Sequence, residues 1–518
     1  MDTATSRLLL SCIFALALGA CADGGSNNRK TVSIDTANAD RCEILDQANC
    51  MFPWPSSAFT VEDDSTVTGR RVNLNQASLP ANKQGVRVDP TQWNRNDGFS
   101  PSQMILAQVP GVDLAKTGAP PITDIEQSLG PDSPVVVMRA STGEPHLVFA
   151  ELDANTSDPA EQAFIIRPMI QFERGERYIV ALRNMRNAAG EILEAPEVFR
   201  ALRDDTLTDN AAIEDRRPAM EDIFSILGDA GIAREELYLA WDFNIASVEN
   251  ITERVLHIRD DAFAGLGNAA PQFSVTEVVD LEPCEETGCE EGQDAYKSRT
   301  IIGTFEVPNY LNSDDGAPGS YFYYTEPNDG LPDRIGGDNL FTAKFYCSIA
   351  RSVAEDFSAP PKALARPSLY GHGLLGSGEE ALRGTGANIN IMANDHQMMF
   401  CGTDWSGFAE EDIGYAVRVL QEWTLLGAVF DRQQQGFLNF MYLARLLKHE
   451  NGLRSHPAFQ AGGVPVFDNS DVYYDGNSQG GILGGALMGI IQDVTRGVLG
   501  VPGMSYSFLL RRSIDFDL

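Results

Sequence analysis

The sequence predicts an α/β protein, in which a β-rich N-terminal region precedes a mostly parallel sheet with helices on both faces. In the C-terminal half, short β-type runs alternate with helical runs, which is the pattern of a parallel sheet. In the N-terminal half, β-type runs at 134–140, 163–170 and 177–182 are joined by turn sequences, which is typical of a small β-sandwich. With 43% hydrophobic and 22% charged residues, the chain has the composition of a folded globular protein.

The charge of the chain argues against one class of partner. It holds 39 Lys and Arg against 73 Asp and Glu, a formal net charge of -34. A chain this acidic is repelled by phosphate backbones and by anionic lipid surfaces. We therefore expect no nucleic-acid partner.

The N-terminus has the features of an export signal. Arg7 precedes an apolar run at 8–20, which is too short to span a bilayer but suits the core of a signal peptide. The run ends in Leu-Gly-Ala followed by Cys21, which resembles the lipobox of bacterial lipoproteins. That resemblance implies cleavage before Cys21, lipidation of its thiol and a membrane anchor, and Ala22 favours the outer membrane of the cell envelope. A plain secretory signal that happens to end near a cysteine is the alternative.

Six cysteines lie outside the signal and the lipidation site, and an even number in an exported chain indicates three disulfides. Six cysteines allow fifteen pairings. A metal site is the alternative, but no C-x-x-C pair occurs and no set of histidines lies at ligand spacing from the cysteines. We therefore expect no metal ligand and no cofactor. Spacing favours the pairs Cys42–Cys50, Cys284–Cys289 and Cys347–Cys401.

The regions before the predicted sheet differ in character. Residues 40–130 are rich in Pro, Asn, Asp and Ser, which indicates irregular structure. Residues 130–200 resemble the immunoglobulin-like modules that precede the catalytic domain of some bacterial lipoprotein lipases. Helical patterning follows at 218–263. The acidic loop at 282–294 is interpreted as a solvated disulfide loop, with a calcium site as the alternative.

The C-terminal half supplies the predicted sheet. Runs at 300–308 and 320–325 bracket a turn and suit an antiparallel hairpin. Further strands are predicted at 363–370, 397–401, 471–474 and 496–501, and helices at 379–394, 413–426, 437–447 and 482–491.

The pattern G-x-S-x-G is formed by Gly476, Ser478 and Gly480, directly after the strand predicted at 471–474 and before the helix predicted at 482–491. A sharp strand-to-helix turn holds a serine hydroxyl exposed beside a base, which makes it a nucleophile. Glycine is needed on both sides because a side chain there would collide where the turn folds back. A chance match in a chain with 47 glycines is the alternative.

A second glycine motif, Gly-His-Gly-Leu-Leu-Gly at 371–376, has two interpretations. It matches the dinucleotide fingerprint G-x-G-x-x-G. However, the nearest strand-end acid, Asp404, lies 28 residues past Gly376, whereas the fingerprint needs about twenty. The same residues spell H-G-x-x-G, the loop after the third strand of α/β-hydrolases. Together, in this order and strand context, the two motifs resemble the serine esterases and lipases of that family over about residues 300–518.

That resemblance implies the chemistry of the site. Ser478 would attack an ester carbonyl and form an acyl-enzyme. The oxyanion hole would consist of Gln479, Leu374 and Gly373, with the backbone N–H groups of Gln479 and Leu374 stabilising the oxyanion. His372 is expected to order the loop rather than to carry protons.

The predicted site is incomplete. Asp404 and Trp405 follow a strand end and are predicted to line the pocket, with a helix cap and a core tryptophan as the alternative. In the family, a catalytic acid and then a histidine follow the serine. Here 40 residues follow Ser478, and all six histidines precede it. The acid and the histidine are expected beyond Leu518 in a longer chain; alternatively the fold is a remnant without efficient turnover, or His456 or His372 is recruited from upstream.

The predicted function is hydrolysis of carboxylic esters, of small molecules or lipids, by an esterase or lipase. A non-catalytic surface binding lipoprotein with a degenerate hydrolase fold is one alternative. A peptidase or polyester depolymerase with the same machinery is another. The predicted organisation is a signal peptide (1–20), a tether (21–38), a β-rich domain (39–215, immunoglobulin-like at about 130–200), a helical connection with the acidic loop (216–295) and an incomplete α/β-hydrolase domain (296–518).

Overall fold

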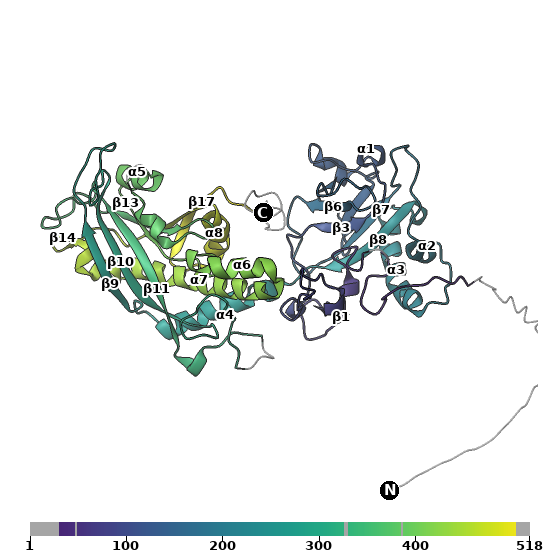
Figure 1. The fold of residues 1–518 in the computed structure, drawn as a ribbon, viewed down its shortest axis with the longest axis horizontal. Helices are drawn as coiled ribbons and strands as arrows, with labels where there is room; N and C mark the ends of the chain where they lie inside the picture. Colours follow the sequence, from purple (N-terminus) through teal and green to yellow (C-terminus); the bar gives the residue numbers. More distant parts are fainter. Residues whose placement is uncertain (1–30, 47–48, 326–329, 385–386, 504–518) are drawn as a thin grey trace, which may run out of the picture.

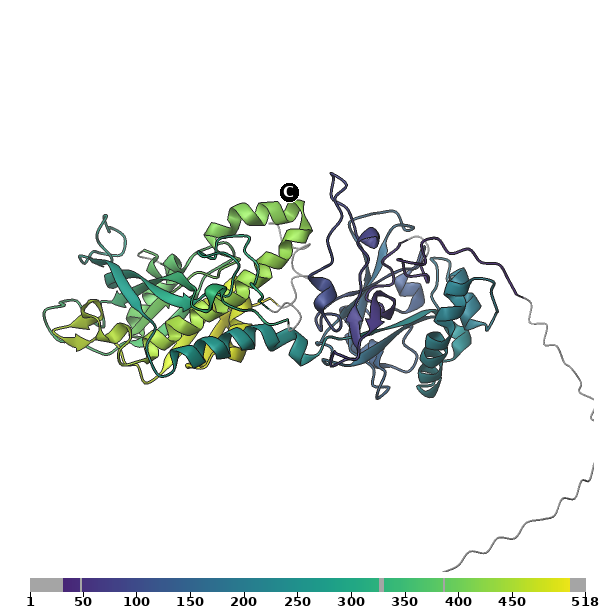
Figure 2. The same cartoon turned by 90° about the horizontal axis from the view of Figure 1, so that it is seen from below.

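The computed structural model describes residues 31–46, 49–325, 330–384 and 387–503, which fold around two hydrophobic cores (Figure 1). One core extends from Ile34 to Ile245 and the other from Val255 to Val494. The N-terminal module (31–247) and the sheet module (248–503) lie end to end along the long axis, as both views show (Figures 1 and 2). The predicted signal peptide and Cys21 lie outside the described residues. Within the described ranges, none of the helices combines the length and apolar character of a membrane span.

The N-terminal module contains two three-stranded antiparallel sheets, which share one core. The predicted strands at 134–140, 163–170 and 177–182 are present in these sheets. A short hairpin of β1 (Thr60–Glu62) and β2 (Arg70–Val72) and a one-turn helix, α1 (Leu114–Thr117), flank them. The two sheets consist of β3 (Ile105–Gln108), β6 (Ala163–Pro168) and β5 (Val148–Leu152), and of β4 (Val135–Arg139), β7 (Arg177–Arg183) and β8 (Leu237–Asn244).

The division between the modules lies later in the chain than residue 215, the predicted end of the β-rich domain. Helices α2 (Glu197–Arg203) and α3 (Ala211–Asp229) pack against β8. Ile223 of α3 and Trp241 of β8 are fully buried in the N-terminal core. Helix α4 (Val248–Leu266) packs instead on the second core. The chain therefore passes from one module to the other directly after β8.

The sheet module is built on seven strands in the order β17-β16-β12-β13-β11-β10-β9. The four strands β17, β16, β12 and β13 are mutually parallel, whereas β11, β10 and β9 continue the sheet in antiparallel fashion. The predicted parallel sheet is therefore present as one half of a mixed sheet. The strands are β9 (Phe273–Asp280), β10 (Lys297–Pro308), β11 (Leu340–Ala350), β12 (Arg366–Gly371), β13 (Met398–Gly402), β16 (Val472–Asn477) and β17 (Val494–Gly500).

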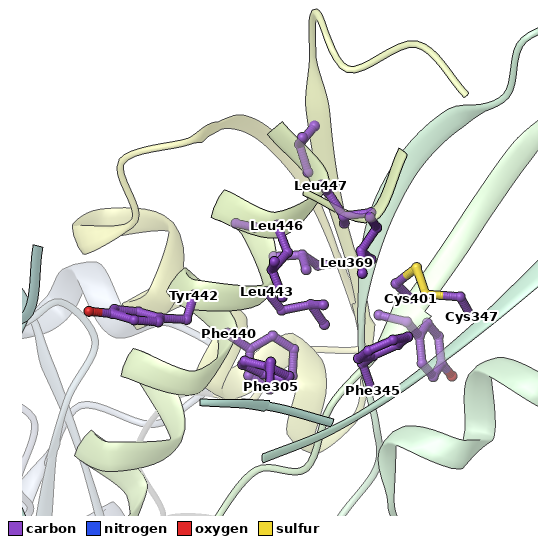
Figure 3. Close-up of a cluster of buried hydrophobic side chains, with 14 of the residues drawn as sticks. Phe305, Phe345, Cys347, Leu369, Cys401, Phe440, Tyr442, Leu443, Leu446 and Leu447 are labelled. Carbon is purple, nitrogen blue, oxygen red and sulfur yellow. A yellow bond between two sulfur atoms is a disulfide. The ribbon is translucent and has the colours of Figure 1, made fainter. Parts of the chain in front are cut away.

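Helix α7 (Leu426–Lys448) is the central helix of this module. It contacts β10, β12, β16 and α4, and most of its residues are buried. Its side chains Leu443, Leu446 and Leu447 belong to the same buried cluster as the sheet residues Leu369 and Phe345 (Figure 3). The remaining elements are α5 (Asn388–Asp395), α6 (Ile413–Gln421), α8 (Gln479–Ile490) and a small hairpin of β14 (Gln460–Ala461) and β15 (Val464–Pro465).

Several predicted elements have different bounds or partners in the structure. The hairpin predicted between 300–308 and 320–325 is wrong, because β10 pairs with β11 and β9, while Phe322 makes only an isolated bridge to Leu311. The helix predicted at 379–394 divides into a 3-10 turn (Gly378–Leu382) and α5. The helix predicted at 437–447 begins eleven residues earlier, at Leu426.

Three disulfides are formed, and their pairing is the one that the spacing favours. Cys347–Cys401 joins β11 to β13 and is fully buried among the side chains of the second core (Figure 3). It therefore links the antiparallel half of the sheet to the parallel half. Cys42–Cys50 lies in the N-terminal module and Cys284–Cys289 in the acidic loop after β9.

Candidate active site

The order of the strands reverses beside β12. From β12 the chain passes to β13 on one side and later to β16 on the other. In open parallel sheets, ligands bind at the carboxyl ends of the strands at such a reversal. Both glycine motifs lie here, because Gly371 ends β12 and is paired with Gly476 of β16. The fold therefore brings two motifs that are about a hundred residues apart in the sequence to the carboxyl ends of two neighbouring strands.

Ser478 occupies the turn between β16 and α8 in a strained conformation. Its φ of 56° and ψ of -118° are rare for a residue with a side chain, and such strain costs about 1–3 kcal/mol. Its N–H donates to the carbonyl of Gly500 at 3.0 Å, and its own carbonyl accepts from the N–H of Ile482 at 3.0 Å. The neighbouring strand and helix thus hold the turn, while the serine itself is exposed.

Three glycines allow α8 to approach the sheet this closely. A Cβ atom on Gly480 would lie 2.1 Å from the carbonyl oxygen of Gly371. On Gly371 or Gly476 it would lie 2.2 or 2.3 Å from the Tyr474 hydroxyl. That hydroxyl donates to the carbonyl of Gly480. The steric requirement predicted for 476 and 480 is therefore present, and Tyr474 is a contributor that the motif did not reveal.

His372 orders the glycine loop. It is fully buried; its Nε2 accepts the N–H of Trp405 at 2.8 Å, and its Nδ1 lies 2.7 Å from the carbonyl of Gly373. Because Nε2 is the acceptor, the proton is on Nδ1 and is donated to Gly373. Burial lowers the pKa of His372 below its ordinary value, so the ring is neutral. Both ring nitrogens are engaged in structure, which matches the predicted ordering role.

The N–H groups of the loop are not equivalent. Gly373 donates to the Glu380 carboxylate at 3.4 Å, and Gly376 donates to the carbonyl of Gly373 at 3.1 Å. Leu375 donates at 3.0 Å to a carbonyl in the segment after β13. In contrast, the N–H of Leu374 donates to no acceptor within the described parts of the chain, and 40% of the residue is exposed. Leu374 is therefore the loop position that can donate a hydrogen bond to a ligand.

Gln479 is the first residue of α8, directly after Ser478, and its side chain is buried. The helix dipole places positive potential at this end of α8. The close approach of Gly480 to Gly371 brings this helix end beside the end of β12. The N-terminus of α8 and the start of the glycine loop therefore lie at the carboxyl ends of β16 and β12.

The pocket residues predicted after β13 have other roles. Asp404 accepts the N–H of Gly378 at 2.7 Å, and burial raises the pKa of its carboxyl. Trp405 is fully buried and stacks on Phe440 of α7 with the ring centres 3.7 Å apart. The prediction that Trp405 lines a pocket is therefore wrong, because α7 covers it. Asp404 binds the N–H of Gly378 from a separate segment, whereas the N-cap residue of that turn is Ser377.

No hydrogen bond joins Ser478 to a histidine among the residues that the structure describes. The nitrogen Nδ1 of His456 accepts the N–H of Ala458 at 3.2 Å, and His372 is engaged as described above. Neither histidine is thus placed for recruitment as a base. The rings of His146, His257 and His449 bond to backbone carbonyls elsewhere. The described residues also contain no group of three or more His, Cys, Asp or Glu side chains that could hold a metal ion.

Of the comparisons with known proteins, the one with solved structures gives matches. No family model matches the chain, and no curated protein matches its sequence. Among solved structures, the chain is similar to acetyl xylan esterase 1 from Thermoanaerobacterium sp. JW/SL YS485, with 16% sequence identity and a TM-score of 0.26. The similarity covers 51% of this chain and 62% of that chain, which is less than two thirds of the esterase. A likeness this loose carries no argument, so the functional assignment depends on the turn at Ser478 and on the glycine loop.

Proposed function

We propose that this protein is a serine hydrolase of the α/β-hydrolase type, which cleaves carboxylic esters through an acyl-enzyme on Ser478. One observation carries the proposal: a serine strained at φ 56° between a parallel strand and a helix lies at the same strand reversal as a glycine loop with an open N–H. Strand, turn and helix around G-x-S-x-G, with a donor loop after an earlier strand, is the arrangement of a nucleophile elbow and its oxyanion hole.

The arrangement supports the following chemistry. The Oγ atom of Ser478 attacks the ester carbonyl, and the carbonyl oxygen becomes negatively charged. The N–H groups of Leu374 and Gln479 stabilise that charge, each by about 3–4 kcal/mol. The proton of Ser478 passes to a general base during the attack, and the base gives it to the alcohol as the ester bond breaks. Water, deprotonated by the same base, then hydrolyses the acyl-enzyme and releases Ser478 and the acid. Because no described histidine contacts Ser478, we assign the base to a group outside the described residues.

We propose that the protein is exported and anchored through a lipid on Cys21, as an outer-membrane lipoprotein of a bacterial cell envelope. Its three disulfides support this proposal, because such bonds form and persist in oxidising compartments. Ester substrates, of small molecules or of lipids, would be its partners.

Covalent labelling tests the nucleophile. The full-length protein is treated with a fluorophosphonate probe, and the labelled peptide is identified by mass spectrometry. We expect the label on Ser478 and its loss in Ser478→Ala, with Ser100→Ala, an exposed serine in the N-terminal module, as the control that keeps it. A folded protein that takes no label, or that keeps it in Ser478→Ala, contradicts the proposal and favours the binding lipoprotein.

A matched pair of variants tests the donor loop. Leu374→Pro removes the backbone N–H, whereas Leu374→Ala keeps it. We expect Leu374→Pro to lower the hydrolysis of p-nitrophenyl acetate by about 100-fold or more, and Leu374→Ala to keep it within a few fold. Circular dichroism shows that both variants are folded. Equal rates for the two variants would remove Leu374 from the oxyanion hole.

A further inference from the structure

A cavity of about 500 Å³ lies where the two modules meet. One wall comes from residues 80–88 of the N-terminal module, and the other from residues 420–424, at the end of α6 and the turn after it. None of the lining residues belongs to the elbow or to the glycine loop. Its volume is within the range of about 300–1,000 Å³ that is usual for small-molecule sites.

Hydrogen bonds hold the two walls in place. The Asn82 amide donates to the carbonyl of Gln421 at 3.2 Å, and the N–H of Asp89 donates to the Thr424 hydroxyl at 3.0 Å. The Asn82 side-chain oxygen also accepts the N–H of Val86 at 2.9 Å, which fixes the turn of the first wall. The cavity is thus preformed, which lowers the entropic cost of binding a ligand.

The walls expose large apolar side chains. Trp423 is 60% exposed, Leu420 is 57% exposed and Val86 is 48% exposed. The neighbouring part of the apolar face of α6 is already buried, through Tyr415 and Val419, in a small core of its own. The part that carries Leu420 is left uncovered, and exposed apolar surface of this kind often marks a binding site. An apolar ligand would cover that part.

Positive charge lies on the same walls. Lys83 and Arg87 line the cavity. Although the chain has a net charge of -34, neither of them forms an ion pair with an acidic side chain among the described residues. The Arg87 guanidinium donates to the carbonyl of Leu79, which holds it at the wall. Glu422 is the one acidic residue among the lining residues. Two cations beside an apolar surface suit an amphiphile with an anionic head.

We propose that this cavity binds an aliphatic carboxylate, with the tail against Leu420 and Trp423 and the carboxylate near Lys83 and Arg87. The inference is independent of the proposed hydrolysis, because it uses other residues and no chemical step. Dodecanoate is the probe, with dodecyltrimethylammonium as the analogue of opposite charge. Isothermal titration of the full-length protein should show one dodecanoate per chain, bound at least about tenfold more tightly than the cation.

Variants locate the binding. Leu420→Asn should weaken dodecanoate binding by about tenfold or more, and the double variant Lys83→Gln/Arg87→Gln by a similar factor. Ile192→Asn and Lys116→Gln, at exposed positions elsewhere in the N-terminal module, should leave it unchanged. Trp423 is the most exposed of the five tryptophans, so dodecanoate should also protect it from acrylamide quenching, a signal that Trp423→Phe removes.

Three outcomes would overturn the proposal. The first is the absence of dodecanoate binding, and the second is binding that Leu420→Asn leaves unchanged. The third is a dimer of the ligand-free protein that Leu420→Asn dissociates, which would identify a second copy of the chain as the occupant. None of these readouts measures hydrolysis, so failure here leaves the serine hydrolase proposal standing.

Discussion

The position of Ser478 depends on the close contact between Gly480 of α8 and Gly371 of β12. Gly480 lies in the first turn of α8 and faces the backbone of Gly371, so a side chain there would meet atoms that cannot rotate away. Gly489 lies near the other end of the same helix, where a Cβ atom would have nothing within 4 Å. Two glycines in one helix therefore differ in what they contribute to stability.

We predict opposite effects for alanine at these two positions. Gly480→Ala should lower the free energy of unfolding by more than about 3 kcal/mol, because α8 must move away from β12. Gly489→Ala should raise it by about 0.5–1 kcal/mol, because alanine favours a helix over glycine. Urea denaturation followed by circular dichroism measures both. If Gly480→Ala were as stable as Gly489→Ala, the close packing of α8 on β12 would be contradicted.

At the scale of elements, the sequence predicted best what depends on neighbouring residues. The strand, turn and helix around Ser478 are local, and so are the bounds of β13 and β4. The partner of β10 is not local. The sequence pattern pairs β10 with the nearest later run, 320–325, but the eleven residues of β11 offer a longer ladder. Pairing depends on which strand fits, and a single sequence does not show this.

In the candidate site, too, the roles that depend on neighbouring residues are predicted from the sequence, and those that depend on distant residues are not. The role of His372 followed from its place in the motif, and the structure gives it two backbone partners. Trp405 was misplaced because its burial comes from Phe440, a residue of α7 that no motif connects to it. The contribution of Glu380 to the site is likewise not visible in the sequence, because no motif connects it to the loop. Its carboxylate accepts the N–H of Gly373, while the N–H of Leu374 stays available to a ligand.

Two of the disulfides close loops of very different length. Cys347–Cys401 closes a loop of 54 residues, whereas Cys284–Cys289 closes one of 5. A longer loop restricts the unfolded chain more, so the double variant Cys347→Ala/Cys401→Ala should lose about 4 kcal/mol, and Cys284→Ala/Cys289→Ala about 2 kcal/mol. Urea unfolding of the two variants gives the order. A larger loss for the acidic loop would show that chain entropy does not govern these bonds.

At the scale of the whole molecule, the two cores are linked by few polar contacts. Besides the bonds that flank the cavity, the Arg95 guanidinium donates to the Tyr324 hydroxyl at 2.9 Å and lies over the Tyr324 ring. The N-terminal core, in contrast, is closed by its own elements, because β8 completes a sheet and α3 covers it. A unit with its own core and few contacts to its neighbour is expected to fold alone.

We therefore predict that residues 31–247 fold without the sheet module, whereas residues 31–215 do not. The shorter fragment ends at the boundary predicted from sequence and lacks β8, most of α3 and the buried Trp241, whose indole N–H donates to the carbonyl of Pro55 at 2.8 Å. Without them, β7 loses its partner on one side and the core is open to water. The longer fragment should unfold cooperatively in urea and show near-ultraviolet circular dichroism, and the shorter one should show neither. Cooperative unfolding of both would place the core within residues 31–215, and failure of both would mean that the N-terminal module depends on the sheet module for its stability.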